Sequence, residues 1–160
     1  MMTLIRRLLV LAVLMFWQGG FTFYAAVVVP IGQSVLQSHI RQGLITREVA
    51  YYLNLTGVFT LLVLAWDAAV SRDPLLRRRQ WRWFSWCAMV VSTGVLLWLY
   101  PRLDQLFDSQ NLELLDSKTF HREHRWYLWI STAQWGFGVL YTILTLRSWR
   151  GEDRQSASTA

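Results

Sequence analysis

The sequence predicts an all-α integral membrane protein, a four-helix transmembrane bundle with both termini in the cytoplasm. Of its 160 residues, 54% are apolar and only 16% are charged, well below the quarter of charged residues that is usual in soluble domains. The apolar residues also gather in four blocks of about twenty, enough to cross roughly 30 Å of hydrocarbon at about 1.5 Å per helical residue. Because the acyl layer offers no water, each block must be a helix that satisfies its own backbone hydrogen bonds.

The four predicted spans follow one another in a single domain, residues 1–150. They cover about residues 8–30, 50–70, 81–100 and 126–146. Arg6 and Arg7 precede the first apolar run, as basic residues precede the apolar region of a secretory signal peptide. The run is too long for a signal peptide and lacks a polar cleavage region, so we interpret it as a span that the protein retains. Pro30 should bend or end the first helix. Residues 151–160, GEDRQSASTA, should form a disordered cytoplasmic tail.

The distribution of basic residues predicts the orientation. Ten lie at the N-terminus, in the second connection and in the tail: Arg6, Arg7, Arg72, Arg77, Arg78, Arg79, Arg82, Arg147, Arg150 and Arg154. The first and third connections carry only six, and six acidic residues accompany them. Since lysine and arginine are enriched in cytoplasmic loops, both termini should be cytoplasmic. The net charge of +6 is therefore an orientation signal, and we expect no nucleic acid as a partner.

Each predicted span carries small or polar residues at mid-depth. Helix association in lipid depends on close backbone approach and interhelical hydrogen bonds, so these residues should hold the bundle together. Six glycines fall within the spans: Gly19, Gly20, Gly57, Gly94, Gly136 and Gly138. Four polar side chains in the middle third of the membrane could instead line a path for a solute or a proton: Gln18, Ser92, Thr93 and Gln134.

Asp67 is the one charge that we place inside a span, three residues from its cytoplasmic end. A functional path usually carries an ionisable group at depth. Asp67 lies close enough to the interface to reach it, or to pair with Arg72 or Arg82. Interhelical structural contacts therefore explain the polar residues better than a path does.

All three histidines, His39, His121 and His124, fall on the predicted outer side. His121 and His124 are three residues apart and would share one face of a helix, a spacing that two metal ligands can have. Further ligands would have to come from His39, Glu123 or another loop, and the arginines beside the pair would repel a cation. No histidine lies at mid-depth to hold haem, and no catalytic motif is present. We expect no cofactor and no enzymatic activity.

Three segments share features with known membrane proteins: FWQGGFTFYAAVVVP, YPRLDQL and FHREHRWYLWIS. The first combines aromatic residues, a glycine pair and an apolar run that ends in proline. Together they resemble a family of small four-helix membrane proteins of unknown function, related to a vertebrate transmembrane protein associated with cisplatin resistance. The matching positions are Trp17, Gly19, Gly20, Pro30, Pro101, Phe120 and His124. The resemblance implies that Pro101 closes the third span. The first span also resembles a copper-resistance membrane domain, and neither resemblance implies a catalytic residue.

The sequence thus predicts a non-catalytic accessory or interaction protein of the cytoplasmic membrane. Its surroundings would be the lipid bilayer, and its partners other membrane proteins or a second copy of the chain. Two alternatives remain open. The first is a small transporter or channel component that uses the mid-membrane polar residues, and the second is a metal-handling or copper-handling protein with its site at the outer histidines.

Overall fold

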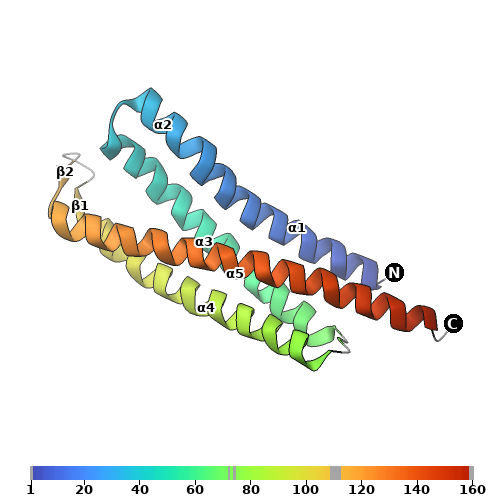
Figure 1. Ribbon diagram of the computed structural model, residues 1–160. Coiled ribbons are helices and arrows are strands. Elements are labelled where there is room, and N and C mark those ends of the chain that lie inside the picture. The colour runs from blue at the N-terminus through green and yellow to red at the C-terminus, as the bar shows by residue number, and fades with distance from the viewer. Residues whose placement is uncertain (1, 72, 74, 109–112, 159–160) are drawn as a thin grey trace.

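The computed structural model describes residues 2–71, 73, 75–108 and 113–158. This part of the chain is almost entirely helical, which confirms the predicted all-α class. Four long helical rods lie alongside one another in an elongated bundle (Figure 1). The N-terminus, the C-terminus and the connection between the second and third rods lie at one end, which we call the charged end. We call the opposite end the far end.

The first rod joins three helical segments without a break: α1 (Met2–Phe23), the π-helical turn η1 (Tyr24–Val28) and α2 (Val29–Leu36). Pro30 does not end the helix, since it lies in the first turn of α2 directly after η1. A proline lacks the N–H donor, and its ring crowds the carbonyl four residues earlier. The wider turn of η1 accommodates both effects. The rod ends at Leu36, after which Gln37 adopts a left-handed conformation with a φ of 48°.

The second rod, α3 (His39–Val70), begins well before the predicted boundary at residue 50. The hydroxyl of Ser38 caps its start and accepts a hydrogen bond of 3.3 Å from the backbone N–H of Arg41. Such a cap satisfies one of the amides that a helix leaves unpaired in its first turn. The apolar span and the polar segment that precedes it are therefore one continuous helix.

The third rod, α4 (Leu76–Gln105), also extends beyond its predicted span. Pro101 was expected to close this helix, but the helix continues past it to Gln105. A proline this close to a helix end removes a single backbone hydrogen bond, so the last turn persists. The strands β1 (Phe107–Asp108) and β2 (Glu113–Leu114) follow and pair in an antiparallel ladder, with Phe107 opposite Leu114.

The fourth rod, α5 (Ser117–Ser158), includes most of the segment that was predicted to be a disordered tail. The prediction of disorder is wrong for residues 151–158, and residues 159–160 lie outside the described residues. The physical reason is tertiary. Glu152 and Asp153 form ion pairs with Arg6 and Arg7 of α1, and these contacts anchor a segment whose polar composition alone would leave it disordered.

The bundle exposes large apolar side chains as well as burying them. Its core contains Val10, Leu14, Leu64, Met89 and Tyr141, all buried. Large apolar side chains are also exposed along every rod, for example Phe16, Leu62, Val91 and Leu128. Three segments are long and apolar enough to cross a membrane: Met2–Leu36, His39–Val70 and Leu76–Gln105. A fourth span, within α5, remains a prediction.

The predicted glycine contacts form at only some of the positions. Gly57 lies against the indole of Trp17, where an added Cβ would be 3.0 Å from Nε1. Gly138 lies against the side-chain amide of Gln18, which leaves no room for a Cβ. At three exposed glycines an added Cβ would meet nothing within 4 Å: Gly19, Gly94 and Gly136. Those three glycines face outward, so they do not bring the helices of this bundle together.

Candidate functional site

A buried ion network occupies the charged end of the bundle. Asp67 of α3 is fully buried, and its two carboxylate oxygens face different helices. Oδ2 lies 2.7 Å from Nη2 of Arg82 on α4, and Oδ1 lies 3.2 Å from Nε of Arg6 on α1. The sequence predicted that Asp67 would pair with Arg72 or Arg82. The pair with Arg82 is confirmed, and Arg72 lies outside the described residues.

A second layer of charges connects this network to α5. Nη2 of Arg6 donates to Oε2 of Glu152 at 3.0 Å, and Nη2 of Arg7 reaches the same oxygen at 3.3 Å. Arg7 also donates to Oδ1 of Asp153 at 2.8 Å, and its guanidinium lies 5.4 Å from the ring of Trp149. The hydrogen bond from Arg7 lowers the pKa of the Asp153 carboxyl below its usual value.

Neutral groups surround Arg82, which is only 1% exposed. Its Nη1 donates to the hydroxyl of Ser71 at 2.7 Å and to that of Ser148 at 3.3 Å. The guanidinium also lies 5.5 Å from the ring of Tyr141, whose hydroxyl donates to the carbonyl of Leu64 at 2.8 Å. Because a buried charge is stable only when it is paired and hydrogen-bonded, these contacts explain how α4 carries an arginine in the interior.

The network is balanced in charge and involves all four rods. Three guanidiniums face three carboxylates: Arg6, Arg7 and Arg82 against Asp67, Glu152 and Asp153. The removal of one member of a buried pair leaves an uncompensated charge and costs about 3–5 kcal/mol. The network therefore links the rods at the charged end and constrains their relative register.

Sequence reasoning found the pair of Asp67 and Arg82 but missed Arg6 as the second partner of Asp67 and Glu152 as the partner of Arg6. These two residues are separated by 146 positions, and no local pattern connects residues so far apart. The one usable signal was the predicted topology, since two cytoplasmic termini must lie at the same end of the bundle.

The structure brings three of the four candidate path residues together and leaves one apart. Nε2 of Gln134 donates to Oγ1 of Thr93 at 2.6 Å, and both residues are buried. Nε2 of Gln18 reaches the carbonyl of Trp135 at 3.5 Å, from α1 to α5. The hydroxyl of Ser92 donates to a carbonyl one turn earlier in its own helix. Gln18, Thr93 and Gln134 thus make interhelical hydrogen bonds far from either end of the bundle.

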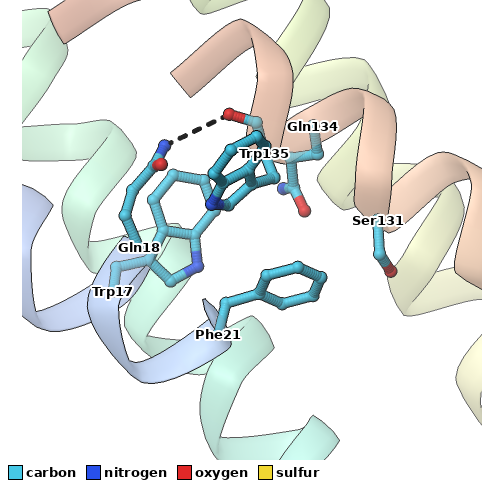
Figure 2. A pocket seen from close by; sticks show the side chains of 6 residues that line it. All are labelled: Trp17, Gln18, Phe21, Ser131, Gln134 and Trp135. Atoms are coloured by element: carbon cyan, nitrogen blue, oxygen red, sulfur yellow. Dashed lines mark hydrogen bonds between the residues drawn. The ribbon is translucent and has the colours of Figure 1, made fainter. Parts of the chain in front are cut away.

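A small cavity lies between α1 and α5 at this level (Figure 2). Its lining residues are Trp17, Gln18, Phe21, Ser131, Gln134 and Trp135. Figure 2 shows the aromatic rings around the space, with the amide of Gln18 directed toward the carbonyl of Trp135. The cavity volume is about 10 Å³, which is room for a single water molecule. The site can therefore hold a water but not a larger solute in this conformation.

His121 and His124 lie in the first turns of α5. The ring of His124 stacks on Phe120 with centroids 5.8 Å apart, and Nδ1 of His121 lies 2.5 Å from the carbonyl oxygen of Ser117. Burial lowers the pKa of His124, and the neighbouring His121 adds to the effect. Among the described residues, no group of three or more histidine, cysteine or acidic side chains could hold a metal ion. His39, at the start of α3, is therefore not part of such a group with this pair.

Comparison of the chain with known protein families, curated proteins and solved structures returned no match.

Proposed function

We propose that this chain is a multi-pass protein of the cytoplasmic membrane, with four spans and both ends in the cytoplasm, and that its role is to associate with other helices in the membrane. Three apolar rods support insertion, and residues 126–146 of the fourth rod carry no charge. The two chain ends and the first turn of α4, which carries Arg77, Arg78 and Arg79, share one end of the bundle. An excess of arginine favours a cytoplasmic location for that end.

The observation that carries the interaction role is the outward orientation of the mid-span glycines. Gly94 of α4 and Gly136 of α5 are exposed, and each has open space where a Cβ would stand. Gly136 lies one turn after Thr132, which is also exposed, so α5 presents two small residues four positions apart. Small residues at this spacing let the backbone of another helix approach closely in lipid. The occupant of that surface would be a helix of another membrane protein or of a second copy.

The interior of the bundle supports the interaction role rather than transport, because the polar groups of the described residues do not form a continuous path. Leu14 of α1 is buried and lies along its helix between Arg6 and the cavity. Met89 of α4 is also buried and lies along its helix between Arg82 and Thr93. The mid-depth amide of Gln134 is already hydrogen-bonded to Thr93. In this conformation the polar groups stabilise the fold, and apolar side chains separate them along the bundle.

Gly136→Leu tests the interaction role, with Gly43→Leu as the matched control. An added Cβ meets nothing within 4 Å at either position, and leucine is the better helix former by up to about 1 kcal/mol, so neither change should unfold the monomer. Native electrophoresis of membranes extracted in mild detergent should show an assembly larger than the monomer for the natural chain and for Gly43→Leu. Gly136→Leu should run as the monomer. A natural chain that is monomeric, both in the gel and after cross-linking in intact membranes, contradicts the proposal.

The transport alternative has a separate test. Vesicles that contain the purified protein should show no more ion or proton flux than vesicles that contain the Gln18→Leu, Gln134→Leu double variant. A flux that the natural chain supports and the double variant loses would favour a polar path over the interaction role.

A further inference from the structure

An apolar groove lies near the far end of the bundle, between the first rod and α3, where the proposed interaction surface does not reach. Its volume is about 340 Å³, at the lower end of the range of about 300–1,000 Å³ typical of small-molecule sites. The walls are almost wholly apolar and include Phe23, Val27, Ile31, Val35 and Ile45. One polar side chain, that of Gln42, completes the lining.

Gln42 is the feature that distinguishes this groove from an ordinary packing gap. The residue is only 3% exposed, and neither Oε1 nor Nε2 of its side chain has a hydrogen-bond partner among the described residues. The amide lies against the backbone of Gly32, where a Cβ would overlap it. A buried amide without a partner is costly, so an occupant of the groove that formed a hydrogen bond with it would relieve that cost.

The irregular turn of the first rod borders the same groove. Val27 and Val28 belong to the π-helical turn η1, and both contribute to the lining. Turns of this kind interrupt the regular helix and occur frequently at functional sites. The left-handed Gln37 follows α2 directly and begins its connection to α3.

We propose that this groove binds one acyl chain of a glycerophospholipid from the bilayer, and that Nε2 of Gln42 donates a hydrogen bond to the ester carbonyl of that chain. The lining residues carry no charge, so the groove has nothing to attract a phosphate headgroup. An extended apolar tail with a single carbonyl acceptor at one end matches a groove of apolar walls and a single amide. The proposal rests on the proposed insertion of the chain in a membrane.

The position of Gln42 along α3 places it near the polar boundary of a bilayer. With 32 residues at about 1.5 Å each, α3 is roughly 48 Å long, slightly more than the 40–45 Å of a bilayer with its headgroup layers. Gln42 lies about one turn from the far end of α3. At about 1.5 Å per residue, Gln42 is roughly 20 Å from the middle of α3. Its backbone therefore falls in the headgroup layer, which begins about 15 Å from the midplane, a few ångströms outside the ester carbonyls.

Photocrosslinking can detect the bound chain. The protein is reconstituted in vesicles of phosphatidylethanolamine and phosphatidylglycerol with a trace of phosphatidylglycerol that carries a diazirine on one acyl chain, and labelled peptides are mapped by mass spectrometry. Labelling of residues 23–45 should exceed that of residues 84–98, an exposed apolar face of α4, several-fold. Val35→Trp should abolish the excess because it narrows the groove. Val91→Trp, at an equally exposed valine of α4, should not.

The role of Gln42 requires a second variant. Gln42→Leu keeps the size of the side chain and removes the unpartnered amide, so the fold should persist. One neutral hydrogen bond contributes roughly fivefold to a binding equilibrium. An ester-linked lipid should therefore compete with the photoactivatable probe about five times better than its ether-linked analogue in the natural chain, and equally well in Gln42→Leu. Equal competition in the natural chain overturns the assigned hydrogen bond.

The two proposals fail in different ways. If the groove and the α4 face are labelled to the same extent, the bound acyl chain is disproved and membrane insertion stands. If neither region is labelled, the chain is not inserted in the vesicles, and both the membrane assignment and the lipid site are overturned.

Discussion

Asp67→Asn tests how strongly the ion network stabilises the bundle. The substitution preserves the size of the side chain and removes its charge. Arg82 lies 2.7 Å from one oxygen and Arg6 lies 3.2 Å from the other, and both arginines are buried. After the substitution two guanidiniums would face each other across a neutral amide in the interior. Arg6 would keep Glu152 as its partner, whereas Arg82 would keep only neutral hydroxyl groups.

The expected loss is large because the site excludes water. The side chains of Asp67 and Arg82 are 0% and 2% exposed, so the pair belongs to the buried class, for which the removal of one partner costs about 3–5 kcal/mol. A chain of this size loses about 2–4 °C in Tm for each kcal/mol. We therefore expect Asp67→Asn to lower Tm by about 6–20 °C.

The assay is thermal unfolding in detergent micelles at pH 7, followed by circular dichroism. Asp104→Asn is the control, because Asp104 pairs with Arg47 at 2.8 Å while both side chains are more than a third exposed. Such a pair is worth at most about 1 kcal/mol. The double variant Asp67→Leu, Arg82→Met should recover most of the loss, since an apolar pair of similar volume can replace a buried ion pair.

Two results would refute this reasoning. If Asp67→Asn and Asp104→Asn lower Tm by the same amount, burial does not increase the contribution of an ion pair to the stability of the bundle. If the apolar double variant is less stable than Asp67→Asn alone, the loss comes from the shape of the side chains and not from an uncompensated charge.

Three further predictions concern other contacts of the bundle. Gly57→Leu should destabilise the fold by about 1–3 kcal/mol, because a side chain there must displace the indole of Trp17. Gly94→Leu places its side chain in open space, so it should be neutral or stabilising in the same unfolding assay. Gln134→Leu and Thr93→Val should show a coupling of about 0.6 kcal/mol in a double-mutant cycle, and strictly additive losses would contradict their hydrogen bond. The hydrogen bond from Arg7 lowers the pKa of Asp153 in the folded state, so its contribution to stability is complete above the unfolded pKa of about 4 and is lost as the pH falls through the folded pKa. The Tm difference between the natural chain and Asp153→Asn should therefore shrink as the pH is lowered below about 4, and a difference that does not shrink would argue against the pair with Arg7.

The sequence by itself determined the helical class and the approximate position of the apolar segments. Long uncharged runs can satisfy their backbone groups in lipid only as helices, and this constraint is local to each run. The same local reasoning found the partner of Asp67, because Arg82 lies on the adjacent helix across a short connection. It failed at helix ends. Pro30 and Pro101 are strong signals of interruption, yet a π-helical turn and the nearness of a helix end accommodate them.

The tertiary structure decided which residues meet across long separations. Glu152 and Asp153 form part of an ordered helix because Arg6 and Arg7 lie opposite them, and only the arrangement of the four rods brings the two chain ends together. The rods also decide which way a glycine faces: Gly57 contacts an indole, whereas Gly136 is exposed. Composition states how many small, polar and charged groups a helix carries, but the direction in which each points depends on the rotation of that helix against its neighbours, which packing alone sets.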